Sequence, residues 1–194
     1  YLVTQLAAPV KYRKRLRKSR LISVMPSKSM QIQYSLPVTG EDVFDEHPEN
    51  LIRLFAIADE TGNDIHPDAM TMAARKSRLI NPATRQNPEM REAFLTLLVD
   101  GNDTGLALRR MNDADVLGRF LPEFGGIVAQ TQFNMYHHFT VDEHTIRAVH
   151  YMAEMDREGG EGFELANRLF QKIDNKRALY LAMLLHDTGK GHGD

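Results

Sequence analysis

The sequence contains no cysteine, which excludes disulfide bonds and thiolate metal sites and fits a reducing compartment. No apolar run approaches the roughly 20 residues that span a bilayer. The basic stretch at 11–20 is not followed by the apolar core of a signal peptide. Hydrophobic residues make up 42% and charged residues 26%, as in ordinary globular proteins. We therefore expect a cytoplasmic protein without a membrane segment.

Acidic residues are missing from the first 38 positions. This segment holds 8 of the 24 Lys and Arg, whereas the rest of the chain has 16 basic against 26 acidic side chains. Partial alternation at 21–25 and 31–36 predicts extended structure. The basic cluster at 11–20 is interpreted as a solvated face or linker. No aromatic ladder accompanies it, so a nucleic-acid partner is not expected.

From Asp42 onward, the signals that start and stop helices are dense. Proline follows a capping residue at the start of several apolar stripes, and glycine follows their ends. These signals predict a mainly α fold. The expected helices of this part begin near residues 48, 67, 87, 103 and 116.

The last third of the chain predicts three further helices. Thr140 and Glu143 match a capping box, and the helix after them is expected to bury a stripe that begins with His144. The stripe continues through Ala148, Tyr151, Met152 and Met155. A second helix is expected over 165–173. The third, 177–187, is capped by Asp174 or Asn175, and its uniformly apolar stretch 178–185 predicts burial on all sides.

Two polar residues, His186 and Asp187, end this apolar helix. An unpaired carboxylate in apolar surroundings costs several kcal/mol or more, so Asp187 needs a partner. A divalent metal is one solution, because imidazole nitrogen and carboxylate oxygen suit Zn, Mn, Fe or Mg. An ion pair with Lys190 or a histidine is the other. The dipeptide alone discriminates little, but a second inward-facing histidine, His144, favours the metal.

Several motifs share their order with a known family. His144 followed by the 184–191 stretch LLHDTGKG resembles the HD superfamily of metal-dependent phosphohydrolases. More narrowly, the chain from about Asp42 onward resembles the bifunctional PII uridylyltransferases/uridylyl-removing enzymes. The motifs that carry this resemblance lie at 50–55, 64–69, 116–124, 135–144 and 184–191.

The resemblance implies part of a longer bacterial nitrogen-signalling enzyme. In that family a nucleotidyltransferase domain attaches UMP from UTP to a tyrosine of the PII protein, an HD domain removes it by hydrolysis, and C-terminal domains sense glutamine. Residues 1–38 are then the tail of the nucleotidyltransferase domain or a linker. Residues 39–130 are a helical linking domain, and 131–194 are the first part of the HD domain. Because the sequence begins with Tyr1 rather than Met, we expect a fragment. Without the fourth ligand of the HD pattern, we expect this fragment to be inactive alone.

The resemblance also implies roles for individual residues. His144, His186 and Asp187 match metal ligands, with Mg or Mn expected first and Zn or Fe as alternatives. His186, Asp187 and Lys190 are the expected catalytic residues, with Lys190 near the phosphate; an exposed or ion-paired lysine is the alternative. The pattern closes with a distant aspartate, and this sequence has none at that separation.

His137 and His138 precede the helix of His144. They are candidate substrate-side residues, although packing at the helix entry is the simpler interpretation. Three other functions stay open. They are an HD hydrolase acting on a free nucleotide such as guanosine tetraphosphate or a cyclic dinucleotide, a non-catalytic helical interaction module, and a nucleic-acid binder whose affinity would fall steeply with salt.

Overall fold

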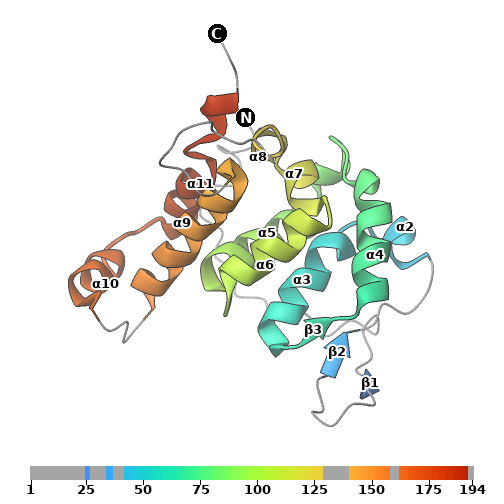
Figure 1. The fold of residues 1–194 in the computed structure, drawn as a ribbon, viewed down its shortest axis with the longest axis horizontal. Coiled ribbons are helices and arrows are strands. Elements are labelled where there is room, and N and C mark those ends of the chain that lie inside the picture. Colours follow the sequence, from blue (N-terminus) through green and yellow to red (C-terminus); the bar gives the residue numbers. More distant parts are fainter. Residues whose placement is uncertain (1–24, 27–33, 37–41, 129–139, 158–161, 192–194) are drawn as a thin grey trace.

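The computed structural model describes residues 25–26, 34–36, 42–128, 140–157 and 162–191. Within these ranges the protein is mainly helical, which confirms the predicted fold class (Figure 1). The α-helices are α2 (Val43–Glu46), α3 (Asn50–Thr61), α4 (Pro67–Lys76), α5 (Pro88–Asp100), α6 (Thr104–Asp113), α7 (Val116–Phe120), α8 (Pro122–Gly125), α9 (Val141–Asp156), α10 (Glu164–Phe170) and α11 (Lys176–Leu185). Short 3₁₀ helices are η1 (Ser77–Leu79), η2 (Thr84–Gln86) and η3 (Thr188–Gly191).

Three very short strands form a small sheet in the order β1, β2, β3. Strand β1 (Met25–Pro26) is antiparallel to β2 (Tyr34–Leu36), which is parallel to β3 (Asp64–Ile65). The strands confirm extended structure at the ends of the predicted 21–25 and 31–36 segments. The basic cluster at 11–20 lies outside the described residues.

Local capping explains where several helices begin and end. The side chain of Asn87 accepts hydrogen bonds from the Glu89 and Met90 amides at the start of α5. Gly62 closes α3 with a left-handed φ of 65°. Asn175, rather than Asp174, caps α11 by accepting from the Ala178 amide. Each cap satisfies amides or carbonyls that a helix end leaves without partners.

The core is continuous from α3 to α11. Helix α5 contacts α3, α6 and α11, and α9 contacts both α6 and α11. Figure 1 shows α5 and α6 between the α9–α11 pair and the α3–α4 side of the molecule. The rings of Phe94 and Phe120, both fully buried, lie 4.9 Å apart between α5 and α7. The α9–α11 pair therefore shares apolar packing with the preceding helices.

Helix α11 is not buried on all sides, and that prediction is wrong. Tyr180, Leu181 and Leu184 are buried, but Ala182 is exposed and Met183 is half-buried. The buried positions i, i+1 and i+4 occupy one side of the helix. A uniformly apolar helix can be buried on all sides, but the helices packed against it determine how much of its surface is covered.

Among the described residues, no helix is both long and apolar enough to cross a membrane.

Candidate metal centre

Helix α9 carries the first candidate ligand. Thr140 occupies the N-cap position as predicted, but its side chain makes no capping hydrogen bond in the described structure. Glu143 instead accepts from the Arg109 Nε of α6, at 3.2 Å to each carboxylate oxygen. The predicted capping box is therefore wrong, because Glu143 forms a long-range ion pair with Arg109 instead of bonding the helix start.

The buried face of α9 also differs from the prediction. Met152 is buried as predicted, and so are Val141, Thr145 and Val149. The side chain of His144, however, is 50% exposed, and Tyr151 is 50% exposed. Thr145 is fully buried because its hydroxyl donates to the Val141 carbonyl at 2.8 Å, which satisfies it inside the helix. His144 consequently lies at the edge of the packed face, on the side of α11.

The other two candidate ligands follow the end of α11. The helix ends at Leu185, two residues before the predicted end, and His186 is its C-cap. Asp187 is buried, at 6% exposure, while the His186 side chain is 37% exposed. The Nδ1 of His186 lies 2.7 Å from the Met183 carbonyl. Because a carbonyl only accepts, Nδ1 carries the hydrogen, and in the neutral imidazole Nε2 keeps its lone pair.

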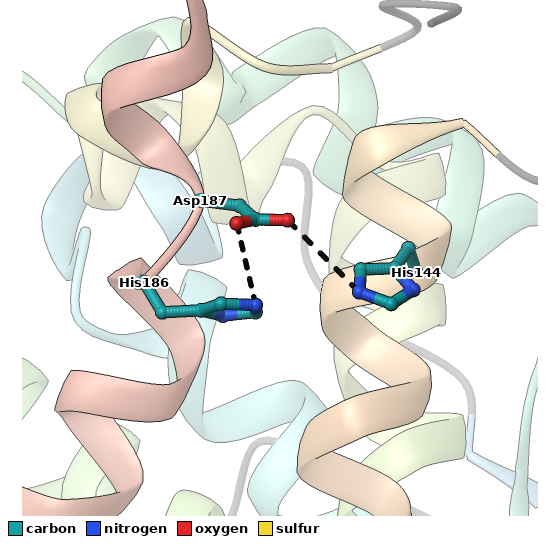
Figure 2. A group of neighbouring side chains, drawn as sticks. All are labelled: His144, His186 and Asp187. Carbon is teal, nitrogen blue, oxygen red and sulfur yellow. Dashed lines mark ion pairs between the residues drawn. The ribbon is translucent and has the colours of Figure 1, made fainter. Parts of the chain in front are cut away.

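The three side chains converge between α9 and α11, as Figure 2 shows. The His186 Nε2 lies 3.4 Å from Asp187 Oδ1, and the His144 Nε2 lies 3.9 Å from Asp187 Oδ2. One ligand atom from each residue falls within 4.8 Å of the others. The imidazole rings are 6.0 Å apart and tilted by 53°. The buried carboxylate thus lies between two half-exposed imidazoles.

These separations fit a shared cation. They exceed the 2.7–3.2 Å of a good N–H···O hydrogen bond, so neither imidazole makes a good direct hydrogen bond to Asp187. Metal–ligand distances of about 2.0–2.2 Å place neighbouring ligand atoms about 3–3.6 Å apart. The 3.4 Å pair falls in this range, whereas the 3.9 Å pair, which involves the other oxygen of Asp187, lies just outside it. Two nitrogens and one oxygen suit a first-row divalent ion.

The other predicted site residues are placed differently. The backbone of Lys190 lies in η3, which begins directly after Asp187. The side chain of Lys190 is outside what the structure describes. His137 and His138 lie outside the described residues. His150, six positions after His144, packs on α6: its Nδ1 is 3.8 Å from Asp103, and a Cβ on Gly105 would lie 2.7 Å from that nitrogen.

The opposite end of the α9–α11 pair is fixed by a polar cluster that sequence reasoning missed. Asp156 of α9 accepts hydrogen bonds from Lys176 Nζ at 2.6 Å and from the Tyr180 hydroxyl at 3.1 Å, both on α11. Burial, and then the negative charge of Asp156, raises the pKa of Tyr180. No sequence spacing signals this cluster, because Asp156 lies 20 and 24 residues before its two partners.

Comparison with known proteins agrees with the resemblance of the motifs. Residues 30–120 match the family model described as uridylyltransferase GlnD third domain. The matched segment ends at the last residue of α7. A bifunctional uridylyltransferase/uridylyl-removing enzyme of Caulobacter vibrioides is 50% identical over 159 residues, or 80% of this chain. The enzyme of the same name from Phenylobacterium zucineum is 51% identical over 151 residues, or 77% of the chain. The chain is homologous to part of these enzymes.

The homology confirms the resemblance inferred from the motifs, and it also defines its extent. The chain spans about 17% of the length of the Caulobacter relative and 16% of the Phenylobacterium relative. A third relative with the same name, from Novosphingobium aromaticivorans, is 46% identical over 157 residues and again matched over 17% of its length. No solved structure matches the chain.

Proposed function

We propose that this chain supplies the first ligands of a divalent-metal centre that removes UMP from uridylylated PII protein. The centre would belong to a longer cytoplasmic enzyme whose other activity attaches UMP from UTP to PII and whose C-terminal region senses glutamine. The observation that carries the proposal is the convergence of His144, His186 and Asp187 from two packed helices. The relatives' names, which include uridylyl removal, supply the reaction.

Each residue has a physical role in this proposal. Asp187 is buried, so water would screen the attraction between its carboxylate and a bound cation only weakly. The Met183 carbonyl fixes the His186 ring with Nε2 towards the site, as outer partners of ligating histidines do. His144 is the most exposed of the three and faces the solvent from which substrate would arrive. A divalent ion, Mg or Mn first and Zn or Fe as alternatives, would supply Lewis acidity and lower the pKa of a water molecule.

Hydrolysis adds water across the bond between phosphorus and the tyrosine oxygen of uridylyl-PII. The tyrosine recovers its hydroxyl, and UMP leaves with the new oxygen on phosphorus. We assign Lys190 to the phosphate, where its positive charge would stabilise charge developing on the oxygens. His137 and His138 are proposed on the substrate side. A further carboxylate ligand would come from the remainder of the longer enzyme.

The proposal is tested in the intact enzyme with His186→Ala and Asp187→Asn. Loss of a ligand side chain should lower the rate of uridylyl removal by at least about a hundredfold. Mutation of residues that only support metal ligands already lowers activity by up to that factor. UMP transfer to PII should persist, because it depends on a different domain. His47→Ala is the matched control, since this imidazole is 58% exposed and lies outside the cluster. Removal of UMP is measured as release of labelled UMP from uridylyl-PII.

The same assay distinguishes the alternatives. Turnover of guanosine tetraphosphate or a cyclic dinucleotide without turnover of uridylyl-PII would assign the site to free nucleotides. Unchanged removal and unchanged metal content in both variants would leave the helices as an interaction module. Either result overturns the proposal.

A further inference from the structure

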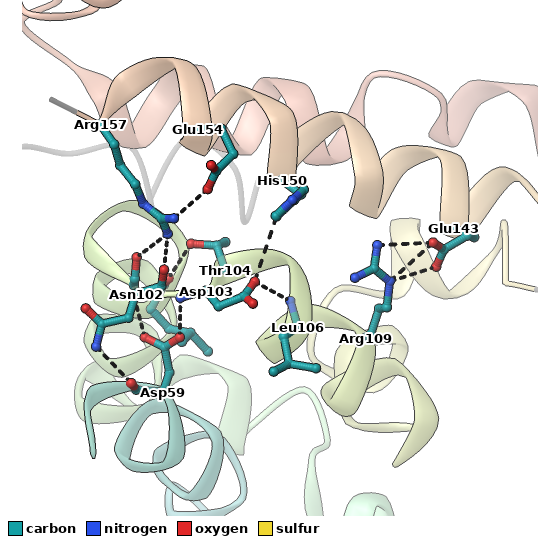
Figure 3. A network of polar contacts seen from close by, with 12 residues as sticks. Asp59, Asn102, Asp103, Thr104, Leu106, Arg109, Glu143, His150, Glu154 and Arg157 are labelled. Carbon is teal, nitrogen blue, oxygen red and sulfur yellow. Dashed lines mark hydrogen bonds and ion pairs between the residues drawn. The ribbon is translucent and has the colours of Figure 1, made fainter. Parts of the chain in front are cut away.

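Helix α9 lies between α6 and α11, and its first turn faces both. Successive residues of a helix point about 100° apart. Asp142 and Glu143 reach side chains of α6, whereas His144 reaches Asp187 beyond α11. Figure 3 shows the α6 side of this arrangement, with Arg109 opposite Glu143. A shift of the first turn of α9 relative to α6 that α11 does not follow would therefore move His144 relative to Asp187.

Two contacts hold this turn against α6. The Arg109 guanidinium donates to both oxygens of Glu143, with Nε at 3.2 Å from each and a third contact at 3.2 Å from its terminal nitrogen. Asn112 Nδ2 donates to Asp142 Oδ2 at 2.9 Å. Asp142 is only 7% exposed, and its Oδ1 has no hydrogen-bond partner among the described residues. The buried carboxylate thus depends on Asn112.

Besides these contacts, the turn is ordered by burial of Val141 and Thr145 and by the His144 amide, which donates to the Thr140 carbonyl at 2.9 Å. The Thr140 side chain makes no capping hydrogen bond in the described structure, and helix ends without caps fray. His144 is part of this turn, so fraying would displace a candidate ligand. Ligands must be held within about 0.5 Å of the productive geometry. The α6 contacts therefore have a consequence for the site beyond the stability of α9.

We propose that Arg109 and Asn112 are positioning residues of the metal centre. They act through Glu143 and Asp142 and set the distance from His144 to Asp187. The inference rests on the proposed function and extends it, because it makes the helices preceding the metal-bearing pair a structural determinant of metal affinity. A change in the orientation of α6 would alter uridylyl removal without contact with substrate.

The test measures Mn²⁺ binding to the intact enzyme by electron paramagnetic resonance, alongside kcat and KM for uridylyl-PII. Arg109→Ala should raise the half-saturating Mn²⁺ concentration about tenfold, at the low end of outer-shell effects, because it acts through the backbone. Asn112→Ala should shift it in the same direction. KM should stay unchanged, and saturating Mn²⁺ should restore kcat. Arg109→Lys, which keeps one charged donor, should recover part of the affinity.

Arg119→Ala is the matched control. This arginine is also ion-paired, with Asp115 at 2.6 Å, but it lies on α7 and is 45% exposed. A merely structural role for Arg109 predicts a lower melting temperature and lower UMP transfer with unchanged Mn²⁺ affinity, and that result overturns the inference. His144→Ala separates the two proposals. If it retains Mn²⁺ binding and removal, the proposed function fails; if it loses both while Arg109→Ala and Asn112→Ala bind Mn²⁺ normally, only the positioning role fails.

Discussion

Substitution of Tyr180 by Phe removes a single hydroxyl from the junction of α9 and α11. The phenol is almost fully buried, at 1% exposure, and donates to Asp156 at 3.1 Å. Hydrogen bonds to charged groups contribute about 1.5–3 kcal/mol to stability. Asp156 keeps its contact with Lys176 in the variant. We therefore expect Tyr180→Phe to lower the free energy of unfolding at pH 8 by about 1.5 kcal/mol, the low end of that range.

The effect of this substitution should depend on pH. Burial and the Asp156 charge raise the pKa of Tyr180, so the folded chain keeps the phenol proton where the unfolded chain loses it. The contribution is complete below the usual tyrosine pKa of about 10 and is lost as pH rises above it. One pH unit above that value, the wild-type chain loses about 1.4 kcal/mol that the phenylalanine variant does not lose. The stability difference should nearly vanish at about pH 11.

The assay is urea unfolding of both chains at pH 8 and at pH 11, followed by circular dichroism. Absorbance at 295 nm provides an independent check, since the wild-type chain should show a late-titrating phenol that the variant lacks. A stability difference that is the same at both pH values would refute the assigned role of Tyr180.

Three further outcomes are expected. Gly118→Ala should destabilise the chain by about 1–3 kcal/mol in thermal unfolding, because overpacking has that cost and the new Cβ would lie 3.0 Å from the Gly125 Cα; Gly126→Ala, whose Cβ would meet nothing closer than 3.5 Å, is the control. A double-mutant cycle on Arg177 and Glu92, which pair at 2.6 Å between α11 and α5, should give a coupling of about 0.5–1 kcal/mol that falls with salt. Addition of MnCl₂ should raise the melting temperature of the wild-type chain, and EDTA should reverse it, whereas loss of any one candidate ligand should abolish both shifts.

Local signals in the sequence predicted most of the helix boundaries. Asn87, Gly62 and Asn175 act within their own helix ends, so a short window contains the whole interaction. The His186-Asp187 pair was likewise readable, because it directly follows an apolar helix. Mainly α structure follows from such signals repeated along the chain.

Contacts between distant segments were not readable in the same way. The buried face of α9 was misassigned in its first turns because Thr145 looks polar in the sequence, yet its hydroxyl is satisfied within the helix. In the sequence Glu143 matches half of a capping box, but in the folded chain it pairs with Arg109, which lies 34 residues earlier. The face of a helix that packs is chosen by its neighbours, and a single sequence without tertiary contacts does not specify them.

The placement of the candidate ligands on two helices has a consequence for folding. His144 and His186 are 42 residues apart in the chain. Bringing the ends of such a segment together in a disordered chain costs about 4 kcal/mol of chain entropy. The unfolded chain would therefore hold an ion far more weakly than the folded one, and nearly all of the binding energy would become folding energy. An ion bound here would be a reversible crosslink, and the cell's free metal concentration would set how firmly α9 and α11 stay together.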